Sequence, residues 1–226
     1  MKNIFSKYTL VARIFPTLLW LIPFYVLQYY YFSDVFPAIF AIKIVGNISL
    51  SLVILYLVSQ FFVRFPSKLL EDFLFGSWLD FPTTKFLMFN NNEYSYEFKN
   101  KIRDKIKSDF WLDLLSDKWE KSNEKEAKLR IKEAVNLMRN HVKNWHLLLQ
   151  HNIEYGFCRN LFGASVLGIF FSSWLVFFSY LNKASFMFSS MLLIVYFLYL
   201  VFGKYMIKYY ANNYAKCLIA EYYNSK

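Results

Sequence analysis

The chain has 226 residues, of which 57% are hydrophobic and 22% aromatic, and its formal net charge is +10. This content of Phe and Tyr argues against an ordinary soluble domain. The charge total is no argument for nucleic-acid binding: residues 64–160 hold 17 basic and 14 acidic residues, and most of the excess flanks apolar runs. Such flanks are typical of membrane spans and also attract anionic lipid.

Four apolar runs, at residues 9–32, 37–63, 161–181 and 186–202, have a length similar to the ~20 residues that cross a bilayer. Backbone polar groups find no water in lipid, so each run should be helical. The first run has no small-x-small cleavage site, and we interpret it as an uncleaved span rather than a signal peptide. The predicted fold is an all-α membrane protein whose four spans form two hairpins, at residues 1–63 and 161–203.

The Lys and Arg count beside the runs sets the expected orientation. The short connectors at 33–36 and 182–185 contain one basic residue, Lys183. Basic residues gather at the opposite ends: Lys2, Lys7, Arg13, Arg64, Lys68, Arg159, Lys204 and Lys208. We therefore expect a multi-pass protein with both termini in the cytoplasm and a cytosolic helical module at 64–160.

The second run carries a polar stripe. Lys43, Asn47, Ser51 and Ser59 are spaced by four and eight residues, so they share one helical face. An ionisable residue inside a span is a functional hypothesis by default, and an oligomer could line a pore with this stripe. The alternative is that Lys43 extends its amine to the outer surface.

The third run has small residues at four-residue steps, Ala164, Gly168 and Ser172. Small residues let helix backbones approach closely, so we interpret this face as a helix-packing face. Residues 204–226, after Gly203, are rich in Tyr, and we predict a cytosolic interfacial helix that folds back onto the module.

The start of the module predicts short elements. Pro66 should end or deflect the second span, because the residue before proline avoids the helical region. Residues 67–75 form an expected amphipathic helix, "DFPTT" an expected turn, and residues 95–115 a longer helix with an apolar stripe. On that helix Lys99, Arg103 and Lys107 share a face, which is either a solvated surface or a phosphate-binding ridge.

A heptad seam follows a capping box at Asn123. Its apolar positions are Ile131, Val135, Met138, Val142, Trp145 and Leu149. The seam packs either within the chain or against a second copy. No strong helix breaker separates it from the third run, so one helix from about Asn123 to Leu181 is expected to carry movement between the module and the membrane.

The stretch "LLLQHNIEYGFCRNLFGAS" concentrates polar groups at the membrane edge. We interpret His151, Glu154, Tyr155 and Gly156 as coupling residues, and Arg139 and Arg159 as further contacts to an anionic ligand. Interfacial anchoring is the alternative.

The histidines, His141, His146 and His151, are five apart and cannot share one metal ion as residues four apart on a helix could. No nucleophile, phosphate loop or ligand set is evident either. We therefore predict no catalytic residue, metal or cofactor, and a protein that is not an enzyme.

"DFPTTKFLMF", "EYSYEFKNKIRDKI" and "LLLQHNIEYGFCRNLFG" together resemble small bacterial membrane effectors of nucleotide-signalling anti-phage defence, most closely the Hailong-type effector. The resemblance covers roughly residues 60–165. It implies an oligomeric pore in the inner membrane, gated by an oligonucleotide or cyclic nucleotide, and it assigns no binding residue. The other hypothesis is a non-conducting scaffold that recruits a cytosolic partner protein. A lipid-modifying or transport protein is disfavoured, because the spans carry no carboxylate.

Overall fold

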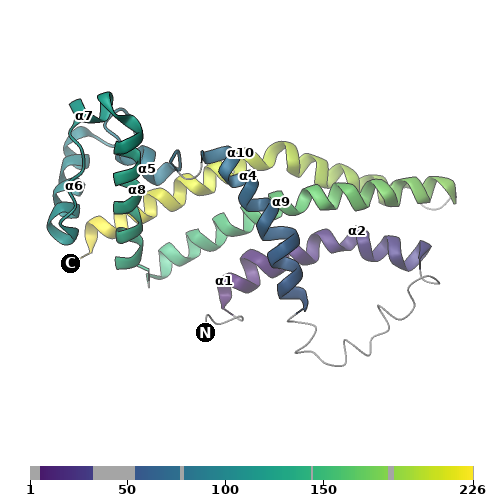
Figure 1. Ribbon diagram of the computed structural model, residues 1–226. Helices are drawn as coiled ribbons and strands as arrows, with labels where there is room; N and C mark the ends of the chain where they lie inside the picture. Colours follow the sequence, from purple (N-terminus) through teal and green to yellow (C-terminus); the bar gives the residue numbers. More distant parts are fainter. Residues whose placement is uncertain (1–5, 33–53, 77–78, 144, 183–185, 226) are drawn as a thin grey trace. The chain divides into compact units, whose positions relative to one another are not determined.

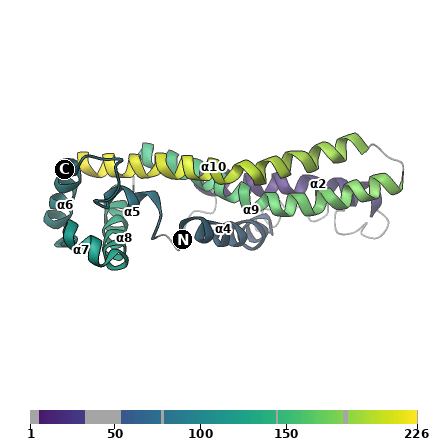
Figure 2. The ribbon, with the colours of Figure 1, turned by 90° about the horizontal axis from the view of Figure 1, so that it is seen from above.

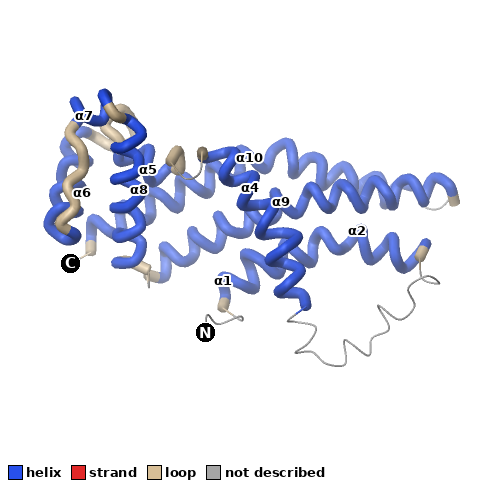
Figure 3. The backbone as a smooth tube through the Cα atoms, in the orientation of Figure 1, coloured by secondary structure: helices blue, strands red, loops and turns tan. Residues whose placement is uncertain are grey.

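The computed structural model describes residues 6–32, 54–76, 79–143, 145–182 and 186–225, and every regular element in these ranges is helical (Figures 1 and 3). The elements in chain order are α1 Lys7–Thr9, η1 Leu10–Ile14, α2 Phe15–Tyr31, η2 Ser59–Arg64, α4 Phe65–Phe75, α5 Pro82–Leu87, α6 Tyr96–Phe110, α7 Asp117–Ser122, α8 Glu124–His141, α9 His146–Leu181 and α10 Phe186–Asn224. The predicted all-helical class is confirmed for these residues.

The contacts divide the chain into two units. Unit 1 comprises residues 1–70 and 156–207, and unit 2 comprises residues 71–155 and 208–226. Helices α4, α9 and α10 each contribute residues to both units. Each unit therefore has its own packing, described separately below.

Three helical stretches are long and apolar enough to cross a membrane: Lys7–Tyr31, His146–Leu181 and Phe186–Asn224. They contain the first, third and fourth predicted spans, and they indicate a multi-pass membrane protein. Most of the second predicted span lies outside the described residues, with Lys43, Asn47 and Ser51 in it.

In unit 1, α2 and the apolar part of α9 run side by side in the same direction. Asn160 donates to the carbonyl of Ala12, and the Tyr31 hydroxyl donates to Ser179 Oγ at 3.1 Å; both pairs are 148 positions apart. The two contacts are 19 residues apart on each helix, which is about 28 Å at 1.5 Å per residue. This length matches the hydrocarbon thickness of a bilayer, roughly 30 Å.

The same part of α9 also packs on α10, which returns beside it (Figure 2). The Ser179 and Ser189 hydroxyls are 2.8 Å apart near the α9–α10 connection, and Phe162 packs at Gly203 near the other end. Most large side chains of α10 between 186 and 202 are exposed, as expected for a lipid-facing helix.

Unit 2 is built around α6, α8 and the end of α10. Ile102 and Ile106 of the α6 stripe are fully buried, and Phe98 and Phe110 are partly buried. The α8 stripe is buried, as expected, and so is one face of α10. The buried α10 residues are Ala211, Tyr214, Ala215, Leu218, Ile219 and Tyr222. Tyr222 stacks on Phe110 and donates to Asp109 at 2.9 Å. After Gly203, α10 continues without a break and supplies core to unit 2. The expected packing of this segment on the module is thus observed, and its interfacial position stays a prediction.

The predicted single helix from Asn123 to Leu181 is also wrong, because α8 ends at His141 and α9 begins at His146. Val142 is the C-cap of α8, with a non-helical backbone (φ −104°) and a fully buried side chain. Trp145 and Leu149, by contrast, are 36% and 40% exposed. The seam is thus a core stripe only as far as Val142, and burial of that side chain outweighs helix propensity. From His146 the helix does continue through Gly156 to Leu181.

The "DFPTT" segment is a helix start rather than a turn. Pro82 begins α5 after an extended Phe81. The N–H of the first helical residue has no acceptor within the helix, so proline, which lacks an N–H, is well suited to this position.

Candidate functional site: a polar junction of two π turns

Two π-helical turns, η1 and η2, lie next to prolines in unit 1. The Phe15 N–H donates to the Leu10 carbonyl and the Phe65 N–H to the Gln60 carbonyl, five residues back in each case. A proline cannot donate to the carbonyl four residues before it, and a π turn is one way to absorb that loss. The helix therefore passes through Pro66, so of the two predicted effects of this proline, ending or deflecting the span, the first does not occur.

A hydroxyl residue follows each proline. Thr17 Oγ1 donates to the Arg13 carbonyl at 2.8 Å, and Ser67 Oγ donates to the Val63 carbonyl. The chain thus repeats a pattern of arginine, one or two apolar residues, proline and a hydroxyl residue, "RIFPT" and "RFPS". The two turns contact each other, so the repeated pattern forms one structure, which we call the π junction.

Asn160 of α9 joins the two halves of the π junction. Its side chain is fully buried, and its amide donates to the Ala12 carbonyl, the group that Pro16 leaves without its usual donor. The backbone carbonyl of Asn160 accepts a hydrogen bond from Ser67 Oγ at 3.4 Å. A buried amide with this arrangement fixes the register of α9 against both π turns.

Two glycines bring α9 close to these turns. A Cβ on Gly163 would lie 2.8 Å from the backbone N and Cα of Ser67, and one on Gly156 would lie 3.2 Å from Ala12 Cβ. Backbone atoms cannot move away as a flexible side chain could. The glycines are seven residues apart on one face of α9, where they permit contacts that a side chain would block.

The π junction is cationic. Arg13 lies 5.3 Å from the Tyr8 ring, Arg64 Nη1 donates to Gln60 Oε1 at 2.7 Å, and Arg159 is 6% exposed beside Asn160. Burial lowers the pKa of Arg64, and repulsion from Arg13 and Arg159 lowers it further. The described residues of unit 1 include no Asp or Glu, and Glu71, the next residue of α4, is assigned to unit 2.

The predicted coupling residues do not form one cluster. His151 Nδ1 lies 3.3 Å from Glu154 Oε2 on the surface of unit 2. Tyr155 is buried in unit 2, donates to Glu71 and packs on Phe81. Gly156, the next residue, belongs to the π junction in unit 1. A coupling role for these residues stays a prediction.

The predicted cationic ridge on α6 is wrong for Lys99 and Arg103. Lys99 is 1% exposed and donates to the Met88 carbonyl at 2.8 Å, while Arg103 is 8% exposed and pairs with buried Glu120. Loop carbonyls need buried donors, and these two cations supply them. Only Lys107 remains on the surface, 2.8 Å from Asp113.

Arg139 lies 5.8 Å from the Tyr214 ring in unit 2, and Arg159 lies in the π junction of unit 1. The expected ligand residues are therefore divided between the two units. A ligand role for Lys107, Arg139 and Arg159 stays a prediction.

The described part of the predicted pore stripe is Ser59, which is buried and donates to the Tyr56 carbonyl at 2.7 Å in its own helix. On α9, Ala164 and Ser172 are fully buried, and the Tyr196 ring leaves no room for a Cβ at Gly168. The pore role of the stripe stays a prediction.

The sequence prediction used Arg13 and Arg64 only for the orientation of the spans. The signal was present in the repeated arginine–proline–hydroxyl pattern. It also missed Trp111, which ends α6 at a left-handed φ of 56° with 93% of its surface exposed. An exposed aromatic in a conformation that disfavours a bulky residue points to a contact role.

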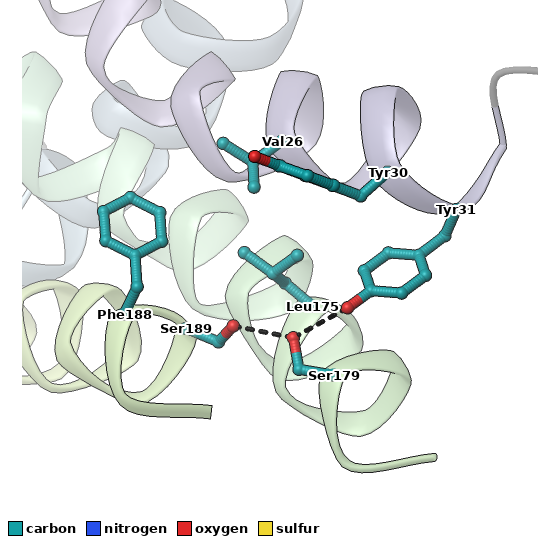
Figure 4. A pocket seen from close by; sticks show the side chains of 7 residues that line it. All are labelled: Val26, Tyr30, Tyr31, Leu175, Ser179, Phe188 and Ser189. Atoms are coloured by element: carbon teal, nitrogen blue, oxygen red, sulfur yellow. Dashed lines mark hydrogen bonds between the residues drawn. The ribbon is translucent and has the colours of Figure 1, made fainter. Parts of the chain in front are cut away.

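A cavity of about 490 Å³ lies in unit 1 beside the Tyr31–Ser179–Ser189 hydroxyl chain (Figure 4). Its lining is mostly apolar, and the lining residues are Val26, Tyr30, Tyr31, Leu175, Ser179, Phe188 and Ser189. Ser179 is 19 residues from Asn160 on α9, so the cavity is about 28 Å from the π junction. These residues carry no charge, so they suit hydrocarbon better than an anion.

Among the described residues, no three His, Cys, Asp or Glu side chains are placed to hold a metal ion. No protein-family model, curated protein or solved structure matches the chain. The arrangement of the π junction can position helices and attract an anion, because it combines buried amide contacts with three guanidinium groups.

Proposed function

We propose that the chain is an oligomeric four-span effector of the bacterial inner membrane, with an ion path gated by its cytosolic helical module. The observation that carries this proposal is continuity: α9 and α10 each extend from a membrane-length apolar segment into unit 2 without interruption. A change in unit 2 therefore has a direct covalent and helical route to the spans.

Four spans are supported by where the described ends lie. Tyr31 contacts Ser179 at one end of unit 1, whereas η2 contacts η1 at the other end. The described chain ends on either side of the apolar run 37–63 therefore lie about 28 Å apart, a distance that a fourth span would cross. Positive flanks at the π junction end support a cytoplasmic location for that end and for both termini.

Gating is supported by the construction of the π junction. Three helices meet there through a few polar contacts, at two turns that already depart from α-helical hydrogen bonding. π turns are frequent at functional sites, where such a departure allows helices to change register. The ligand class, an oligonucleotide or cyclic nucleotide, is supported by the resemblance alone, as is the role in anti-phage defence.

The test is ion flux from liposomes that contain the purified protein, with and without short oligonucleotides and cyclic nucleotides. Lys43→Met should change the conductance, because it removes a charge from the proposed pore stripe. Lys183→Met, in a connector between spans, is the matched control and should leave conductance unchanged. Absence of flux from folded protein under every condition would refute the pore.

The second candidate function is a membrane scaffold that recruits a cytosolic partner protein. Trp111 and Trp119 of unit 2 support it, because they are 93% and 66% exposed. Large exposed aromatics are enriched at protein interfaces. Alanine at both positions should abolish partner capture from the native host without altering ion flux, whereas alanine at buried Met138 would disturb folding instead.

A further inference from the structure

The cations of unit 1 lie at one level. Asn160 of α9 contacts Ala12 and Ser67, and this places the neighbouring Arg13, Arg64 and Arg159 around the same point. The apolar run of α9 begins directly after this level, at Leu161. Phosphate groups of lipids occupy the same depth, just outside the hydrocarbon.

Two donors at this level have no acceptor among the described residues. They are Arg13 Nε on η1 and Gln60 Nε2 on η2, both buried. A buried donor without an acceptor is costly. The chemistry that suits the site is an anion with several acceptor oxygens.

The geometry of arginine favours a phosphate over a simple halide or carboxylate anion. A guanidinium presents its donors as a planar fork that matches phosphate oxygens, and it loses less hydration than an ammonium group. The Tyr8 ring beside Arg13 adds an apolar wall, as expected at the boundary between headgroup and hydrocarbon.

We propose that Arg13 and Arg64, next to Arg159, form a binding site for a phosphate group at the cytoplasmic end of unit 1, and that an anionic phospholipid headgroup supplies it. The site fastens η1, η2 and α9 to one another through one lipid. It requires that unit 1 is inserted in a membrane, but it does not require the pore or the nucleotide signal.

The test is native mass spectrometry of the full chain in mild detergent, titrated with dioleoylphosphatidylglycerol or dioleoylphosphatidylcholine. Wild type should prefer the anionic lipid at least about 10-fold, since charge-assisted bonds to two arginines are involved. Arg13→Gln with Arg64→Gln should remove most of this preference. Lys118→Gln, an exposed change on unit 2, should leave it within about twofold, as expected for a remote surface charge.

A variant pair keeps the test valid if the glutamines prevent folding. Arg13→Lys with Arg64→Lys retains both charges but not the planar forks, so the preference should fall to an intermediate value. Protection of buried Cys158 from a thiol reagent reports folding of unit 1 in each variant.

Three results would overturn the proposal. One is an unchanged lipid preference in folded glutamine and lysine variants. Another is an equal loss in Lys118→Gln, which would make the preference a property of total charge. The third is displacement of the lipid by millimolar glycerol phosphate or inorganic phosphate, which would assign the site to a soluble phosphate. None of these measurements uses ion flux, so the lipid site and the pore fail separately.

Discussion

Asn160→Leu tests whether Asn160 replaces the donor that Pro16 lacks. The leucine has a similar volume but donates nothing, so the buried Ala12 carbonyl loses the amide that now contacts it. Leaving a buried carbonyl without this partner costs about 1–3 kcal/mol of unfolding free energy. We therefore expect Asn160→Leu to lower the unfolding free energy of unit 1 by about 1–3 kcal/mol.

The second variant supplies the missing donor from within the helix. Pro16→Ala restores an N–H four residues after Ala12, so the Asn160 amide becomes redundant. In this background Asn160→Leu should cost less, by at least about 1 kcal/mol, a coupling larger than the ~0.3–0.5 kcal/mol seen between independent sites.

Thiol labelling of Cys158 during denaturation in detergent measures this cycle, because Cys158 is buried in α9 near Asn160. Cys217, buried in unit 2, is first replaced by alanine so that only unit 1 is reported. An equal cost of Asn160→Leu in both backgrounds would refute the reasoning, since Pro16 and Asn160 would then act independently.

Three further changes test other contacts. Arg103→Met leaves Glu120 buried without its cation and should destabilise unit 2 by about 3–5 kcal/mol, measured by hydrogen exchange of α6 and α7. Gly163→Ala forces α9 away from α4 and should cost about 1–3 kcal/mol in the Cys158 labelling assay. The bond from Lys128 lowers the pKa of Asp80 below 3.8, so its stabilisation is complete above that pH and is lost as pH falls through the folded-state pKa.

Each of these changes has a matched control and a contrary outcome. Lys107→Met breaks an exposed pair and should cost at most about 1 kcal/mol; a loss as large as that of Arg103→Met would contradict the role of burial. Val166→Ala, at an exposed site of α9, controls for Gly163→Ala. The difference in unfolding free energy between wild type and Asp80→Asn should become smaller as the pH falls below about 4. A difference that does not change with pH would exclude the Lys128 contact.

Much of the helical framework was predictable from the sequence. Apolar length identified the three helical stretches that are long and apolar enough to cross a membrane, and the apolar stripes of α6 and α8 do face the core of unit 2 at Ile102, Ile106 and the α8 positions. The break after Val142 was not predictable from local residues, because the chain there lacks proline and glycine and the turn follows from burial of one side chain. The burial of Lys99 and Arg103 was not predictable for a related reason. Charged residues at helical spacing suggest a solvated face, and only the tertiary structure shows that loop carbonyls accept hydrogen bonds from these two side chains.

The π junction was hidden for a different reason. Proline was interpreted as a residue that ends or deflects a helix, whereas here two prolines are absorbed by longer hydrogen-bonded turns and by neighbouring hydroxyls. Those compensations are local and visible in "RIFPT" and "RFPS". The contact of the Asn160 amide with Ala12 is not local, because it joins residues 148 positions apart.

The matched contacts at the two ends of α2 and α9 also make unit 1 a gauge of bilayer thickness. Both helices fix the same interval of about 28 Å between a cationic level and a hydroxyl level. Neither helix can lengthen its buried segment alone, because the two are tied at both ends. In a bilayer thicker by several ångströms tilting cannot help, because tilt only shortens the thickness that a helix spans, so the lipid must thin around the helices at a cost of fractions of a kcal/mol per ångström. Acyl-chain length is therefore a physical variable to which this pair of helices responds as one body.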